Sequence, residues 1–144
     1  MTLEENLGYV FKNKSLLDRA LTRKAYALEQ RQQNKESEDQ EIFRTLGDAV
    51  LKAVLIDLLI NSGCSTRGEI TSRKKSLERE EGLAEISKRL EMGSVLKLGK
   101  GEEKQNAQEE PYVLAETFEA VIGAVYLDGG FEATKRTIEK LFDI

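Results

Sequence analysis

The chain has 144 residues, 40% of them apolar and 33% charged, which predicts one soluble domain and excludes two separate cores. It contains no histidine, which excludes His-based triads and His-ligated zinc and leaves carboxylates, Lys, Tyr and Ser for chemistry. The net charge of −4 argues against a general nucleic-acid binder, since phosphate binding normally draws on a basic surplus. A lone cysteine, no membrane-length apolar stretch and no signal-peptide pattern together predict a cytoplasmic protein.

The N-terminal third predicts short helices followed by a loop. A helix over 2–7 is expected to end at Gly8, and a second helix is expected to begin at Ser15, with Asp18 completing a capping box. From Leu28 to Gln40 the residues are mostly Glu, Gln, Asn, Lys and Ser. This segment offers little to bury, so the sequence predicts a helix that runs into a mobile loop over 28–40.

The central segment predicts a long buried helix that starts at Glu41 and ends near Asn61. Its apolar residues recur at helical spacing and include Ile42, Leu46, Ala49, Val50, Ala53 and Val54. Glu41, Arg44 and Asp48 share one face of this helix. An acid near the middle of an apolar helix needs a functional explanation.

Helical patterns continue to the C-terminus without strand-like alternation, so the predicted fold class is all-α. Thr66 and Glu69 predict a capped helix through about Leu77, and another amphipathic helix is expected to stop near Gly93. The segment 96–110 is predicted to be a loop. Pro111 suits the first turn of a further helix, which Gly129 and Gly130 end, and a last helix covers 131–142.

Two of these helices carry acids at helical spacing, which favours a divalent-metal site. Glu116 and Glu119 lie three residues apart on an otherwise apolar helix, as Glu41 and Asp48 lie seven apart on the central one. Mg²⁺ prefers carboxylate oxygens and needs only a few of them from the protein. The competing interpretation is a solvent-facing acidic stripe.

A basic cluster, Arg73, Lys74 and Lys75, stands out against the acidic balance of the chain. Interspersed glutamates favour a solvated face with pairs at i,i+4 spacing, whereas RNA-backbone binding is the functional alternative.

Several segments, in order along nearly the whole chain, resemble the catalytic domain of ribonuclease III: Leu7–Asn13, Ala20–Thr22, Leu46–Leu51, Leu98–Glu102 and Phe118–Gly130. The resemblance implies an all-helical endonuclease domain over 1–144 that forms a symmetric homodimer and cuts double-stranded or structured RNA with Mg²⁺, or with Mn²⁺ in its place. The double-stranded-RNA-binding domain usual in the family has no room in these 144 residues.

Carried over residue by residue, the resemblance assigns Asp48 and Glu119 as catalytic metal ligands, with Glu116 and Glu41 as further ligands. Glu116 stands where the family has Asp, and Arg44 stands where the family has a ligand Glu. A guanidinium cannot ligate a cation, and if it points into the acids it is expected to pair with Asp48 or Glu119.

Three hypotheses follow. In the first, the enzyme works with an altered metal site and Arg44 contacts phosphate. In the second, the domain is catalytically silent and binds structured RNA or a protein partner. In the third, the chain is a helical interaction module with no role in RNA chemistry.

Overall fold

The predicted all-α fold is confirmed. The computed structural model describes all 144 residues and contains no β-strand, only one isolated bridge between Thr22 and Lys97. The helices are α1 (Leu3–Leu7), α2 (Lys14–Ala20), α3 (Lys24–Gln32), α4 (Glu41–Asn61), α5 (Arg67–Leu77), α6 (Glu80–Arg89), η1 (Met92–Val95), α7 (Lys100–Lys104), η2 (Ala107–Glu109) and α8 (Pro111–Phe142). None of them combines the length and the hydropathy that a membrane crossing requires.

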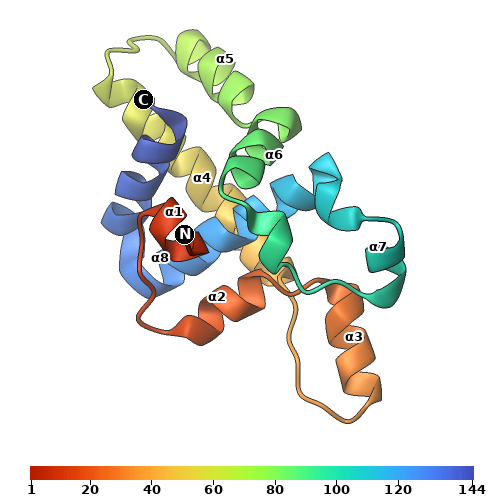
Figure 1. Ribbon diagram of the computed structural model, residues 1–144. Helices are drawn as coiled ribbons and strands as arrows, with labels where there is room; N and C mark the ends of the chain where they lie inside the picture. Colours follow the sequence, from red (N-terminus) through yellow and green to blue (C-terminus); the bar gives the residue numbers. More distant parts are fainter.

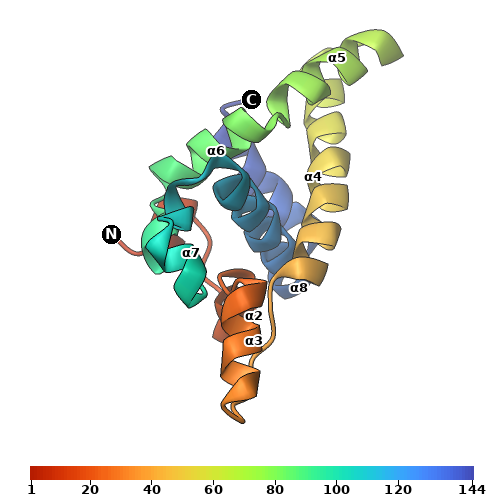
Figure 2. The same ribbon diagram turned by 90° about the vertical axis from the view of Figure 1, so that its right-hand side faces the viewer.

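The long helices α4 and α8 form the centre of the molecule. In Figure 2, α4 runs along one side of α8, and α6 lies on its other side. α2 and α3 lie below this centre in Figure 1, and α5 extends away from it near the end of α4. The core is made of apolar side chains from most of the helices and includes Leu7, Leu51, Leu55, Phe118, Val121, Ile122 and Ile138.

α4 and α8 approach closely because each has a glycine at the crossing point. A Cβ atom on Gly47 would overlap the backbone carbonyl oxygen of Glu119, and one on Gly123 would overlap that of Phe43. Only glycine allows two backbones to come this near. The crossing therefore fixes which residues of the two helices can meet.

Most predicted boundaries agree with the structure, and the differences have local causes. α2 begins at Lys14 and not at Ser15, because the side chain of Asn13 accepts the capping hydrogen bond from the Ser15 amide. α3 continues to Gln32, so the predicted loop over 28–40 is reduced to residues 33–40.

The predicted loop over 96–110 is partly helical. The Glu102 carboxylate accepts a hydrogen bond from the Gly99 amide and helps to start α7. At the other predicted break, Gly130 has φ of 85° and bends α8 between its two parts, which confirms the expected interruption.

The expectation of one buried apolar face on α4 is wrong in part. Val50 and Val54 are buried, but Ile42 is 62% exposed and Ala49 and Ala53 are also exposed. The core takes one side of α4 because only that side faces α8. A second apolar row therefore remains on the surface.

Candidate acidic site at the crossing of α4 and α8

Asp48 and Glu119 meet where α4 crosses α8. Asp48 follows Gly47 directly, and the carbonyl of Glu119 is the group that Gly47 packs against. Both carboxyls line one cavity and lie close enough for a hydrogen bond between them to shift the pKa of each. The close glycine contact thus brings two acids, 71 positions apart in the chain, to one cavity.

The two acids have very different pKa values. Burial raises the pKa of Glu119 to about 8, and its contact with the negative Asp48 adds to this effect. Burial would also raise the pKa of Asp48, but hydrogen bonds from Lys52 and Glu119 outweigh it and hold that pKa below its ordinary value. At neutral pH, Asp48 carries the charge and Glu119 holds the proton.

Lys52 is the second partner of Asp48. Its Nζ lies 2.6 Å from Oδ1 of Asp48, one helical turn along α4. The hydrogen bond to Asp48 raises the pKa of Lys52, so the ammonium stays charged. The same Nζ lies 3.8 Å from Oε2 of Glu78 at the end of α5.

Glu116 does not join the Asp48–Glu119 pair, because arginines hold both of its oxygens. Nη2 of Arg44 lies 2.9 Å from Oε2, and Nη1 of Arg23 lies 2.8 Å from Oε1. Arg23 also donates to Glu102 at 3.1 Å and to the buried Gln40. The expectation that Arg44 pairs with Asp48 or Glu119 is therefore corrected: Arg44 pairs with Glu116.

Glu41 lies at the rim of the same site. Its carboxylate forms an ion pair of 3.2 Å with Lys24 of α3. A shallow cavity of about 330 Å³ opens above the acid pair and is lined by Glu41, Ile42, Arg44, Thr45, Asp48 and Glu119. Four of the five residues predicted for a site at this crossing line the cavity, and Glu116 does not. The side chain of Asp48 is half-exposed.

The donor set at the crossing consists of two carboxylates, Asp48 and Glu119. No three Asp, Glu, Cys or His side chains gather closely enough to hold an ion. Two carboxylates suffice for Mg²⁺, which keeps several of its waters. A cation at the Asp48–Glu119 pair would replace the proton on Glu119, whereas Glu116 would first have to leave its arginines.

The basic cluster on α5 lies outside this site. Lys74 pairs with Glu78 at 3.0 Å, and Arg73 donates to the sulfur of Cys64. Lys75 is exposed and forms no ion pair. A series of ion pairs, from Lys74 to Glu78 to Lys52, connects α5 to Asp48.

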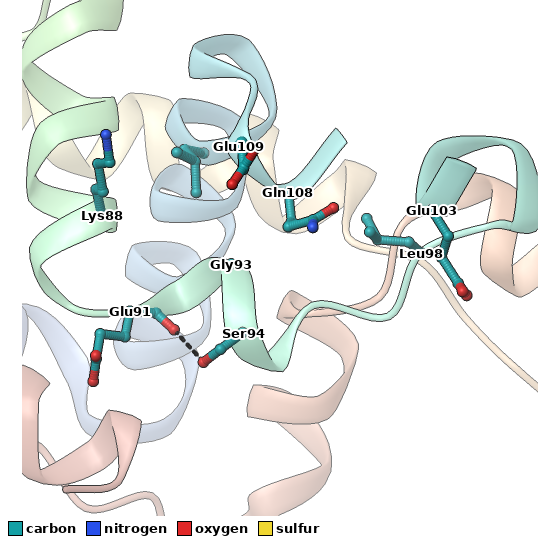
Figure 3. A pocket seen from close by; sticks show the side chains of 9 residues that line it. Lys88, Glu91, Gly93, Ser94, Leu98, Glu103, Gln108 and Glu109 are labelled. Carbon is teal, nitrogen blue, oxygen red and sulfur yellow. Dashed lines mark hydrogen bonds between the residues drawn. The ribbon is translucent and has the colours of Figure 1, made fainter. Parts of the chain in front are cut away.

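A larger cavity, about 630 Å³, lies away from the acid pair among α6, η1, α7, η2 and the start of α8. Figure 3 shows that its charged side chains do not converge: Glu91 and Glu103 lie on opposite sides, and Lys88 points away from both. This cavity therefore lacks the arrangement of a chemical site.

Sequence reasoning missed Lys52 and Arg23. The spacing of four from Asp48 to Lys52 on a predicted helix was a usable signal for an ion pair. The contact from Arg23 to Glu116 had no such signal, because 93 positions separate the two residues.

The chain resembles known proteins over most of its length. A family model described as Ribonuclease-III-like matches residues 13–143. Ribonuclease 3 of Bdellovibrio bacteriovorus is 39% identical over 142 residues, covering 98% of this chain and 59% of that protein. Ribonuclease 3 of Syntrophotalea carbinolica is 39% identical over 141 residues, with coverages of 97% and 60%. The chain thus spans about three fifths of these curated relatives.

Among solved structures, the nuclease domain of ribonuclease III from Campylobacter jejuni superposes with a TM-score of 0.85 at 35% identity. The match covers 99% of this chain and 97% of that one. Two independent measures, sequence and fold, therefore agree over nearly every residue, and the chain belongs to the ribonuclease III family.

Proposed function

We propose that this chain is an endoribonuclease that cuts double-stranded or structured RNA, using one divalent cation, Mg²⁺ or Mn²⁺, held by Asp48 and Glu119. The observation that carries the proposal is that these two carboxyls line one cavity at the close α4–α8 crossing. Membership of the ribonuclease III family supports the choice of RNA as substrate.

The residues around the pair suit phosphodiester hydrolysis. When bound, Mg²⁺ activates water and offsets the charge on the phosphate oxygens. Asp48 and Glu119 hold the cation, and the cavity above them is open enough to admit a phosphodiester. Arg44 reaches the same cavity while its Nη2 remains on Glu116, so its guanidinium can face a phosphate.

We further propose a symmetric homodimer that pairs through the exposed row of α4. Ile42, Ala49, Ala53 and Ile60 fall on one line along the helix and are exposed. A Campylobacter jejuni relative is described as having a region involved in dimer formation in its nuclease domain. An exposed apolar row of this length is typical of a protein interface.

The exposed residues Arg73 and Lys75 of α5 are proposed to contact the RNA backbone. Lys74 is less available for this role because Glu78 holds its ammonium.

The test is cleavage of labelled duplex RNA by the purified chain in Mg²⁺ and then in Mn²⁺. We expect cleavage to require the metal. We expect Asp48→Asn to reduce the cleavage rate at least about 100-fold, because the substitution removes a metal ligand. Asp57→Asn is the matched control, since Asp57 lies on the same helix and pairs with Lys135 away from the site. Metal-independent cleavage, or equal rates for the two variants, would refute the proposal.

One observation favours a silent domain as the second candidate. Both Glu116 oxygens are bound by arginines, which removes one predicted ligand from the site. A silent domain would bind duplex RNA in a salt-sensitive manner and cut it in neither metal. An interaction module without an RNA role would show no such binding.

A further inference from the structure

Two cations flank Asp48 along the same face of α4. Arg44 lies four residues before it and Lys52 four residues after it, so each is one helical turn away. Both also act electrostatically on Glu119. Lys52 lies just beyond the Leu46–Leu51 segment that resembles the family.

A ligand at the acid pair can reach both of these cations. The side chains of Arg44 and Lys52 are 32% and 43% exposed. Lys24 is also exposed, but it pairs with Glu41 at the rim and with neither acid of the pair. Arg23 is 13% exposed and divides its bonds between two carboxylates. A phosphodiester above the acid pair would therefore meet Arg44 on one side and Lys52 on the other.

Lys52 can leave Asp48 without losing all of its anionic partners. Oε2 of Glu78 is buried, has no hydrogen-bond partner, and lies 3.8 Å from Nζ of Lys52. If a metal takes the Oδ1 oxygen of Asp48, the ammonium remains beside Glu78 and keeps its position at the site. A flexible four-carbon stem allows this small movement.

We infer that Lys52 is a substrate-binding residue that works with Arg44 to hold the RNA phosphodiester over Asp48 and Glu119. This inference rests on the proposed function, because it names the group that receives the RNA phosphate at the same site. The physical need is clear: a polyanion brought against two carboxylates is repelled unless fixed cations lie beside them. Only two carboxylates are available to bind metal. Lys52 and Arg44 therefore supply positive charge that a second metal ion would otherwise have to provide.

The experiment measures duplex RNA binding over a series of KCl concentrations in Ca²⁺, and steady-state cleavage in Mg²⁺. For Lys52→Met we expect the slope of log K against log salt to fall by about 0.9, the value for one lost phosphate contact. We also expect KM to rise, and Lys52→Arg to restore both the slope and KM. Lys14→Met is the matched control, because Lys14 also pairs with a carboxylate, Glu4, at 2.7 Å but on α2.

An unchanged salt slope in Lys52→Met would overturn the inference. The inference would also be overturned if Lys52→Met raised the affinity for Mn²⁺ without changing RNA binding. Lys52 would then only compete with the metal for the Asp48 carboxylate. A different outcome would refute the proposed function alone. If neither metal supports RNA cleavage but Lys52→Met still lowers the salt slope of RNA binding, Lys52 binds RNA in a catalytically silent domain. Circular dichroism of each variant confirms folding, which the exposed position of Lys52 favours.

Discussion

Nη2 of Arg44 lies 2.9 Å from Oε2 of Glu116, so Arg44 neutralises Glu116 and not Asp48 or Glu119. Asp48 and Glu119 instead act on each other's pKa. The acids at the crossing are therefore divided into an arginine-bound carboxylate and a pair in which Glu119 holds a proton. This division makes the metal content of the site directly testable.

Replacing Arg44 with Glu should raise the affinity for divalent metal. The change removes a cation and adds a carboxylate beside Asp48, and an increase of at least about 10-fold is expected from the known effects of changes around metal ligands. Titration calorimetry with Mn²⁺ measures it. Arg67→Glu, an exposed position on α5, is the control for the charge change. Equal affinities for the two variants would contradict the prediction.

The metal-free protein should lose stability as pH rises from about 4.5 to about 8. The folded state raises the pKa of Glu119 from 4.5 to about 8, so it binds a proton that the unfolded chain releases near pH 4.5. The free energy of unfolding therefore falls across that window. Urea unfolding at several pH values measures it, and Glu119→Gln should flatten the dependence. A wild-type free energy of unfolding that rises between these pH values would be inconsistent with the raised pKa of Glu119.

Mg²⁺ should stabilise the protein more at pH 9 than at pH 6. The metal competes with the proton on Glu119, and the carboxylate is free only above its raised pKa of about 8. Thermal unfolding with and without Mg²⁺ gives the difference in Tm at each pH. Asp48→Asn should abolish the difference, whereas an equal rise in Tm at both pH values would speak against binding at this pair.

Gly47→Ala should destabilise the fold by about 3 kcal/mol, at the upper end for overpacking. The new methyl would overlap the backbone of Glu119, which cannot move without separating α4 from α8. Denaturant unfolding measures the loss. Gly68→Ala is the control, because nothing lies within 4 Å of its added Cβ, and it should be neutral or stabilising by up to about 1 kcal/mol. If Gly47→Ala and Gly68→Ala had similar free energies of unfolding, the close crossing of α4 and α8 would be contradicted.

Ala53→Glu should weaken self-association. It places a charge in the exposed row of α4, where a paired surface would bury it without a partner. Sedimentation velocity over a range of concentrations should show a dimer for the unmodified chain and a monomer for the variant. Thr71→Glu, at an exposed position on α5, should leave the association unchanged. A monomeric unmodified chain would remove the basis for the proposed dimer.

The sequence by itself determined the fold class and most of the helices. Apolar residues at helical spacing and local caps act within a few residues, so α1, α5 and the start of α8 follow from them. The helices depend on neighbours in the chain. The family resemblance of the segments around Asp48 and Glu119 predicted that these two distant acids share one site.

Only the tertiary structure decided which charged side chains pair and which side of α4 is buried. The contacts of Glu116 with Arg23 and Arg44 join residues 93 and 72 positions apart, and the exposure of Ile42 depends on which side of α4 faces α8. Helical spacing places residues on a common face but does not say what lies opposite. The packing of α4 against α8 through Gly47 and Gly123 settles that question, because it fixes which side chains from distant segments come within bonding distance.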